Sequence, residues 1–228
     1  MKKALFWDFD GTLVHSGSMW SINLHGVLKA KGYNVDFEAL RMHLRTGYTW
    51  HTPEKAYPES VGEKWWGNLF EHLDAFYHEN GVSKTDMAEI NRDFRNSILH
   101  KSSYTLYDDA IETLRLCKEK GYANYIVSNN YPELPRVITE IGLSGYISAC
   151  IVSGAIGYEK PRPEIFQFAL KRAGDPDSAY MIGDNPEADI KGGRAAGLKT
   201  ILVHNDGISA IADYTCARLS EIPDVLKG

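Results

Sequence analysis

Two aspartates separated by one residue follow the first apolar segment of the chain. Asp8 and Asp10 come directly after the run 4–7, and Gly11 and Thr12 complete the pentapeptide. Two carboxylates at this spacing can converge on one cation, and the glycine lets successive backbone N–H groups face an anion. A solvated Asp-Gly turn is the ordinary alternative. Because this pentapeptide is expected by chance in well under roughly 1% of chains of this length, a functional role is favoured.

A second pair of aspartates follows a later apolar run. Asp184 lies two residues after that run, and Asp189 comes five residues further on, in the first turn of an expected helix. Both carboxylates can therefore face the same point as Asp8, and oxygen ligands of this kind are preferred by Mg²⁺. Asn185 and Glu187 are also explained by helix capping and by favourable charge in a first helical turn.

Hydroxyl, amide and ammonium groups follow two other segments. Ser128, Asn129 and Asn130 come directly after the apolar run 125–127. A hydroxyl group and adjacent backbone N–H groups at that position make a phosphate cradle, although the same tripeptide is common in ordinary turns. Lys160 precedes a proline and supplies a positive charge that can neutralise a phosphate and a neighbouring carboxylate.

Strands and helices alternate along most of the chain, which predicts a parallel sheet with helices on both faces. In open α/β sheets the ligands bind at the carboxyl ends of the strands, where all four polar groups lie. We therefore expect an α/β, Rossmann-like fold. The expected strands are 4–7, 123–127, 147–152, 179–182 and 200–203, and the expected helices of this part are 108–120, 133–141, 163–173 and 187–196.

The segment from about residue 16 to residue 100 reads as helical throughout. Its apolar residues recur at spacings of three and four, which is typical of a wide helical stripe. Two further helices are expected at 19–31 and 86–99, with hinges at 14–18 and 100–106. We therefore expect a core formed by residues 1–15 and 101–228, and an inserted all-helical cap formed by residues 16–100. The stripe consists of Val61, Trp65, Leu69, Leu73 and Phe76.

The composition is that of an ordinary globular protein. The 228 residues are 43% hydrophobic and 24% charged, and 25 Lys and Arg against 30 Asp and Glu give a net charge of −5. Without a basic cluster we expect no nucleic-acid polymer as partner. The sequence has no apolar run of membrane-spanning length, and its three cysteines are scattered. We expect no signal peptide. A soluble cytoplasmic protein is expected.

Four segments resemble motifs I to IV of the haloacid dehalogenase-like (HAD) hydrolase superfamily. They occur in the family's order, and the resemblance covers nearly the whole chain. The helical insert is similar to the C1 cap of subfamily I, which includes phosphoglycolate phosphatase-like proteins. The matching segments are 8–14, 128–129, 160–166 and 183–190.

The resemblance implies catalytic roles for the motif residues. Asp8 would be the nucleophile that attacks phosphorus and forms an aspartyl-phosphate. Asp10 would protonate the leaving oxygen and then deprotonate the water that hydrolyses the intermediate. The phosphoryl oxygens would be held by Thr12, Ser128 and Lys160, together with backbone N–H groups that include that of Asn129.

The resemblance also implies a Mg²⁺ cofactor. The ion would bind the Asp8 carboxylate, the backbone carbonyl of Asp10 and Asp184, with Asp189 as a ligand or as a residue that orients the ligands. An anionic nucleophile that meets an anionic phosphate needs charge neutralisation, which Mg²⁺ and Lys160 would provide.

Asp10 distinguishes between the reaction types of the superfamily. A halide leaving group needs no acid, and the family's dehalogenases lack the second aspartate, whereas an alkoxide leaving group needs one. We therefore expect a Mg²⁺-dependent phosphatase for a small phosphorylated metabolite. A phosphomutase or other phosphotransferase is the first alternative. A dehalogenase or a catalytically silent regulatory protein is less favoured.

Substrate choice in a capped enzyme depends on the side chains that the cap presents over the site. Arg45 lies in a segment expected to be a loop between cap helices. A clamp for a second anionic group of the substrate and an ordinary solvated loop are equally favoured interpretations of Arg45. The aromatic residues of the helical stripe are instead expected to form the core of the cap. The other cap candidates are Arg41, His43, Trp50 and His51.

Overall fold

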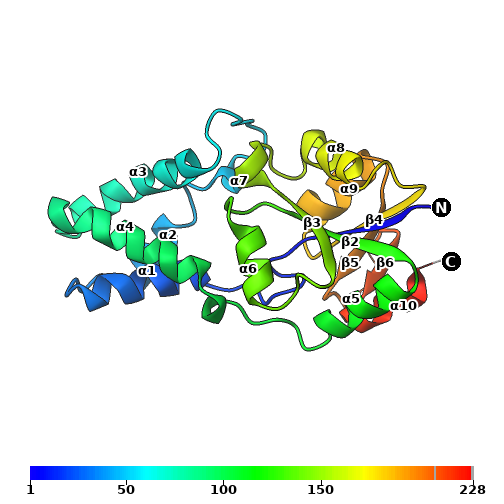
Figure 1. Ribbon diagram of the computed structural model, residues 1–228. Helices are drawn as coiled ribbons and strands as arrows, with labels where there is room; N and C mark the ends of the chain where they lie inside the picture. The colour runs from blue at the N-terminus through cyan, green and yellow to red at the C-terminus, as the bar shows by residue number, and fades with distance from the viewer. Residues whose placement is uncertain (208, 227–228) are drawn as a thin grey trace.

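A six-stranded parallel sheet forms the centre of the molecule. The computed structural model describes residues 1–207 and 209–226. Its strand order is β3-β2-β1-β4-β5-β6, so that the first strand lies between the second and the fourth (Figure 1). This arrangement confirms the expected α/β, Rossmann-like class. The strands are β1 (Lys3–Trp7), β2 (Tyr122–Ser128), β3 (Ile147–Val152), β4 (Ser178–Gly183), β5 (Lys199–Val203) and β6 (Tyr214–Cys216).

Helices cover both faces of this sheet, and the alternation of side chains along β1 explains why both faces are apolar. Leu5 and Trp7 pack into one hydrophobic cluster with residues of α5 and α6, whereas Phe6 packs into a second cluster with α8. The helices of this part are α5 (Ala110–Glu119), α6 (Leu134–Glu140), α7 (Ser153–Ile156), α8 (Pro163–Arg172), α9 (Gly192–Ala195) and α10 (Ile222–Val225), with the π-helical turn η3 (Pro186–Lys191) and the short 3₁₀ turn η4 (Leu219–Glu221).

A bundle of helices follows β1 and lies at one end of the sheet, at the left of Figure 1. The apolar stripe of its longest helix is buried from Trp65 to Phe76, as expected, but the helix begins only at Glu63, after Gly62 with φ of +63°. The helices are α1 (Met19–Ala30), α2 (Phe37–His43), α3 (Glu63–Glu79) and α4 (Lys84–Leu99), with the 3₁₀ turns η1 (Thr49–His51) and η2 (Lys101–Ser103).

The two chain segments that join the helical bundle to the sheet lie side by side. The backbone N–H of His15 donates to the Thr105 carbonyl at 2.9 Å, and that of Tyr107 donates to the Leu13 carbonyl at 3.0 Å. The chain therefore leaves and re-enters the sheet part through one paired crossing, directly beside the loop that carries the first two aspartates.

The structure contains short elements that the sequence analysis missed. Helix α2 has seven residues, and the Asp36 carboxylate caps it by accepting from the Ala39 backbone N–H at 2.7 Å. Strand β6 has three residues and pairs with β5 at the edge of the sheet. The helix expected at 187–196 is divided into η3 and α9. Among the described residues, the structure has no helix that is long and apolar enough to cross a membrane.

Candidate active site

The carboxyl ends of three neighbouring strands meet at one cavity of about 480 Å³. Asp8 follows β1, Ser128 ends β2 and Asp184 follows β4, and these strands are adjacent in the order β2-β1-β4. The helical bundle closes the cavity from the other side. The bundle lines it with Met19, Trp20, Trp50 and Pro53, and the joining segment lines it with His15, Ser16 and Gly17. From the sheet part it is lined by Asp8, Asp10, Ser128, Asn129, Asn130, Lys160, Pro161, Asn185, Glu187 and Ala188.

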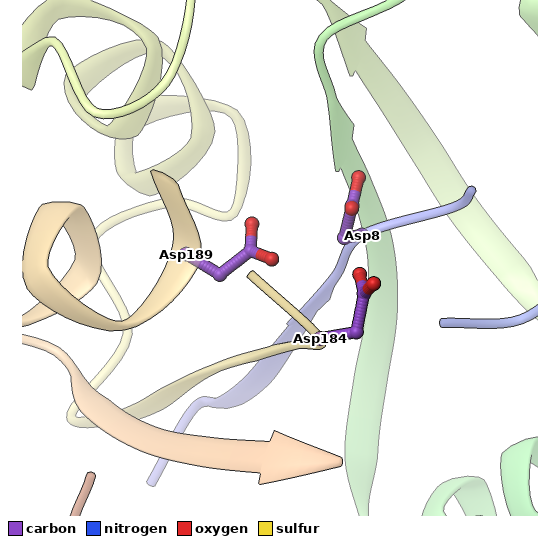
Figure 2. Close-up of side chains that lie close together, drawn as sticks. All are labelled: Asp8, Asp184 and Asp189. Atoms are coloured by element: carbon purple, nitrogen blue, oxygen red, sulfur yellow. The ribbon is translucent and has the colours of Figure 1, made fainter. Parts of the chain in front are cut away.

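Three aspartate side chains lie close together at this edge of the sheet. Figure 2 shows Asp8 at the end of β1, Asp184 after β4 and Asp189 in the turn η3, with their carboxylates grouped together. One oxygen from each lies within 4.8 Å of the others. Because the donors are all carboxylate oxygens, the cluster fits a hard divalent cation such as Mg²⁺.

A buried ammonium group compensates two of these carboxylates. The Lys160 Nζ lies 2.8 Å from Asp8 Oδ1 and 2.6 Å from Asp189 Oδ1, and the lysine side chain is 1% exposed. Burial by itself would lower the pKa of Lys160, but the two carboxylates outweigh it and hold this pKa well above its ordinary value. Lys160 therefore carries a fixed positive charge beside Asp8.

The loop that carries this lysine is held by the asparagine at the end of β2. Asn129 Oδ1 accepts from the Lys160 backbone N–H at 2.6 Å, and Asn129 Nδ2 donates to the Lys160 carbonyl at 3.0 Å. The peptide bond between Lys160 and Pro161 is cis. The Asn129 side chain thus positions the loop that carries Lys160. Asn129 is also one of the residues that line the cavity.

Asp10 faces the cavity beside Asp8 and is held by a residue that the sequence analysis left without a role. Asn130 Nδ2 donates to Asp10 Oδ2 at 2.5 Å. Burial, together with the neighbouring Asp8 carboxylate, raises the pKa of Asp10 to about 7. Asp10 is thus suited to exchange a proton near neutral pH. The sequence feature that indicates a role for Asn130 is its position in the Ser-Asn-Asn tripeptide at the end of a strand.

The Thr12 side chain is turned to Asp184. Its side chain is fully buried, and its hydroxyl group donates to Asp184 Oδ1 at 3.3 Å and accepts from the Asp184 backbone N–H at 3.2 Å. Thr12 is not one of the described residues that line the cavity. The Thr12 hydroxyl group therefore orients Asp184, and its contact with a phosphate stays a prediction.

Glycines allow the aspartates to come this close to the backbone. A Cβ on Gly11, whose φ is +82°, would lie 2.4 Å from Asp184 Oδ2, and a Cβ on Gly183 would lie 2.0 Å from Asp189 Oδ2. Both distances are far below van der Waals contact. Neither position can therefore hold a side chain unless the carboxylate beside it moves.

Replacing Gly183 with alanine is expected to destabilise the fold by about 1–3 kcal/mol, because the new methyl group overpacks the buried Asp189. The matched control is Gly26→Ala in α1, where no atom lies within 4 Å of the added Cβ and a helical alanine is favoured. Urea unfolding measures both variants. Equal stability of the two would contradict the close approach of Asp189 to Gly183.

The cap residues proposed from the sequence fall into two groups. Arg45 is exposed, Arg41 pairs with Glu38 at 2.8 Å, and His43 stacks on His72 with 4.3 Å between ring centres. These three and His51 lie outside the described lining of the cavity, so the structure does not bring an anion clamp at Arg45 to the site. The residues of the bundle that do line it are Trp50, which the sequence analysis included, and Met19, Trp20 and Pro53, which it missed.

A buried glutamate next to the site lysine ties the bundle to the sheet part. Glu159 is fully buried, and its Oε1 accepts hydrogen bonds from the hydroxyl groups of Thr49 and Tyr57. Its Oε2 is buried without a hydrogen-bond partner among the described residues. Burial raises the pKa of Glu159 above the ordinary glutamate value.

Stability is expected to depend on pH through this group. The pKa of Glu159 is higher in the folded state than in the unfolded state, so the folded state binds the proton more tightly. The contribution of Glu159 to the free energy of unfolding is therefore largest at low pH. It is lost as pH rises from about 4.5 through the raised pKa. Glu159→Gln should therefore gain stability relative to the wild type between pH 5 and pH 8 in urea unfolding, whereas exposed Glu187→Gln should not. Parallel profiles for wild type and Glu159→Gln would contradict this.

Clustered aspartates and a buried lysine at the carboxyl edge of a Rossmann-like sheet, closed by a helical insert, define a site of the capped α/β hydrolase type. The profile of the haloacid dehalogenase-like hydrolase family matches residues 2–197, and the chain belongs to this family. The resemblance seen in the four motifs is thereby confirmed.

Three similar proteins illustrate the relationship. The chain is 27% identical over 209 residues to haloacid dehalogenase-like hydrolase domain-containing protein 3 of Bos taurus, covering 88% of this chain and 81% of the relative. It is 27% identical over 232 residues to phosphoglycolate phosphatase of Aquifex aeolicus, covering 99% and 97%. The putative HAD-hydrolase YfnB from Bacillus subtilis, crystallised with magnesium, has the same fold, with a TM-score of 0.73 at 21% identity and coverage of 99% and 98%.

Proposed function

We propose that the protein is a Mg²⁺-dependent phosphatase that hydrolyses a small phosphorylated metabolite through an aspartyl-phosphate on Asp8. The observation that carries the proposal is the pairing of two different carboxyl groups at one cavity. Asp8 is ion-paired with the buried Lys160, whereas Asp10 is hydrogen-bonded to Asn130. Lys160 places a positive charge beside Asp8, whereas burial and the neighbouring Asp8 carboxylate raise the pKa of Asp10 to about 7. The site therefore offers one nucleophile and one proton donor.

The first half of the reaction transfers the phosphoryl group to Asp8. Lys160 holds Asp8 Oδ1, which leaves Oδ2 to attack phosphorus while the bond between phosphorus and the ester oxygen breaks. Asp10 gives its proton to the departing oxygen and so releases a neutral alcohol. Lys160 and the Ser128 hydroxyl group stabilise the charge on the phosphoryl oxygens, together with the backbone N–H groups of the loops that follow β1 and β2.

The second half restores the aspartate. A water molecule attacks the phosphorus of the aspartyl-phosphate, and the Asp10 carboxylate takes a proton from that water. The bond between phosphorus and the Asp8 oxygen breaks, inorganic phosphate leaves, and Asp8 returns to its carboxylate form. Asp10 ends protonated, ready for the next ester.

Mg²⁺ would be held by Asp8 and Asp184, with Asp10 contributing its backbone carbonyl, and when bound it would neutralise part of the charge of the phosphate. Asp189 has both carboxylate oxygens engaged, Oδ1 by Lys160 and Oδ2 by the Asn185 backbone N–H at 3.0 Å. We therefore assign it the role of positioning Lys160 and the metal-binding loop. Burial raises the pKa of Asp189, and Lys160 opposes that rise.

Several relatives support a phosphatase over the other reactions of the family. Besides the phosphoglycolate phosphatase, they include the phosphoserine phosphatase of Thermus thermophilus, 36% identical over 102 residues, and the glyceraldehyde 3-phosphate phosphatase of Pyrococcus furiosus, 24% identical over 240 residues. The presence of Asp10 agrees with these names, because an alkoxide leaving group needs a proton donor and a halide does not.

Asp10→Asn is expected to lower the steady-state turnover of an alkyl phosphate by about 10²–10⁴-fold, because both proton transfers are lost. With p-nitrophenyl phosphate, whose leaving group needs little acid assistance, the variant should still form the aspartyl-phosphate and then stall. Rapid-quench kinetics in Mg²⁺ should therefore show a burst of nitrophenolate close to one per active site, and an EDTA blank should show none. Undiminished turnover of alkyl esters by Asp10→Asn would overturn the assigned role.

A further inference from the structure

The part of the cavity that faces away from the aspartates is apolar and aromatic. The helical bundle lines it with Trp20 and Trp50, both half-buried, together with Met19 and Pro53. The two indole rings lie 5.8 Å apart between centres. An alcohol group that leaves the phosphorus beside Asp8 must occupy this side of the cavity, because the sheet part closes the other.

The charged side chains on this side of the cavity do not favour a second negative group on the substrate. Among the described lining residues, Lys160 and His15 are the only ones of cationic type, and Lys160 is already paired with two carboxylates. His15 lies at the paired crossing, with its ring 3.9 Å from that of Tyr107. Glu187, also in the lining, places a carboxylate at the rim. A second negative group on the substrate would therefore meet a carboxylate and no free lysine or arginine.

Trp20 and Trp50 form an aromatic wall of the cavity, and contacts with the sheet part fix this wall relative to the reacting atoms. Trp50 stacks on Tyr48, with ring centres 4.3 Å apart and planes at 10°. Thr49, directly before Trp50, donates to Glu159, which directly precedes Lys160. The Tyr57 backbone N–H donates to the Gly157 carbonyl at 2.9 Å. The wall and the lysine loop are thus held together, so the distance from the phosphoryl position to the indole rings is set by the fold.

We infer that the substrates of this site are phosphomonoesters whose alcohol part is uncharged and carries a flat ring, which binds against Trp50 and Trp20. A cavity of about 480 Å³ accommodates a phosphate and a ring system together. Stacking and apolar burial bind such a ring, while the absence of a free lysine or arginine from the described lining disfavours a phosphorylated carboxylic acid. The inference rests on the proposed phosphatase activity and names its substrate class.

Three alkyl phosphates test the inference without differences in leaving-group type: phenethyl phosphate, propyl phosphate and phosphoglycolate. Released inorganic phosphate gives kcat/KM for each in Mg²⁺. We expect phenethyl phosphate to exceed propyl phosphate by about tenfold or more, and phosphoglycolate to be the poorest of the three. A preference for phosphoglycolate overturns the inference and leaves the phosphatase function standing. No hydrolysis of any of the three overturns both.

Substitutions of Trp50 test whether this residue causes the preference for phenethyl phosphate. Trp50→Ala should reduce the ratio of phenethyl to propyl kcat/KM about tenfold, and Trp50→Phe, which keeps a ring, should retain most of it. If Trp50→Ala does not fold, Trp50→Leu takes its place, since it keeps apolar bulk and loses the ring. The matched control is Phe168→Ala, which removes an exposed ring on α8 outside the cavity and should leave the ratio unchanged. An unchanged ratio in the Trp50 variants would overturn the inference.

Discussion

Asp8→Asn is expected to reduce the turnover of any phosphomonoester by about 10⁴-fold or more, because an amide cannot form the aspartyl-phosphate. The substitution keeps the size of the side chain, and Lys160 keeps its ion pair with Asp189 at 2.6 Å. The fold should therefore survive, so that the loss appears in kcat and not in the amount of folded protein. Initial rates of phosphate release measure the effect, and thermal unfolding checks the fold.

The control for this prediction is a carboxylate that lines the cavity without a chemical role. Glu187→Gln changes an exposed carboxylate, paired with Lys191 at 2.6 Å, and should reduce turnover less than tenfold. A residual rate for Asp8→Asn within tenfold of the wild type would show that another residue attacks phosphorus.

Lys160→Met is expected to lose both stability and activity. Removing the ammonium group leaves Asp8 and Asp189 close together with no positive charge between them, and breaking a buried ion pair in this way costs about 3–5 kcal/mol. Turnover should fall as well, because the same charge is needed opposite the phosphoryl oxygens. Urea unfolding measures the first effect and phosphate release the second.

A second substitution separates charge from packing in that result. Lys160→Met combined with Asp189→Asn removes a carboxylate along with the ammonium group and should recover part of the lost stability, since partners in one buried network are not additive. The exposed Lys191→Met should cost less than about 0.5 kcal/mol. If Lys160→Met were no more destabilising than Lys191→Met, the buried ion-pair network would not support the fold.

The core of the site was predictable because its residues are local to strand ends. Asp8, Ser128 and Asp184 each follow a short apolar run, and parallel strands bring their carboxyl ends to one edge. The sheet order then places those three ends beside one another. Short motifs are sufficient for such a site, since the fold adds only the order of the strands.

Directions of side chains and short elements were not predictable from the same patterns. The Thr12 hydroxyl group binds Asp184, a contact between two motifs far apart in the sequence that neither motif describes. Helix α2 and strand β6 are too short for a periodic signal. Arg45 was expected over the site, but the bundle presents Trp20 there, in the first turn of α1 beside the crossing. Such placements depend on tertiary packing.

The most direct test of the proposed chemistry is to trap the covalent intermediate and locate it. Acid quenching of the wild type and of Asp10→Asn during turnover of p-nitrophenyl phosphate, followed by peptide mass spectrometry, should find one added phosphoryl group on Asp8, with more of it in the variant. Asp8→Asn should carry none. Phosphorylation of a different residue, or undiminished hydrolysis with no phosphorylated peptide in either protein, would contradict the mechanism.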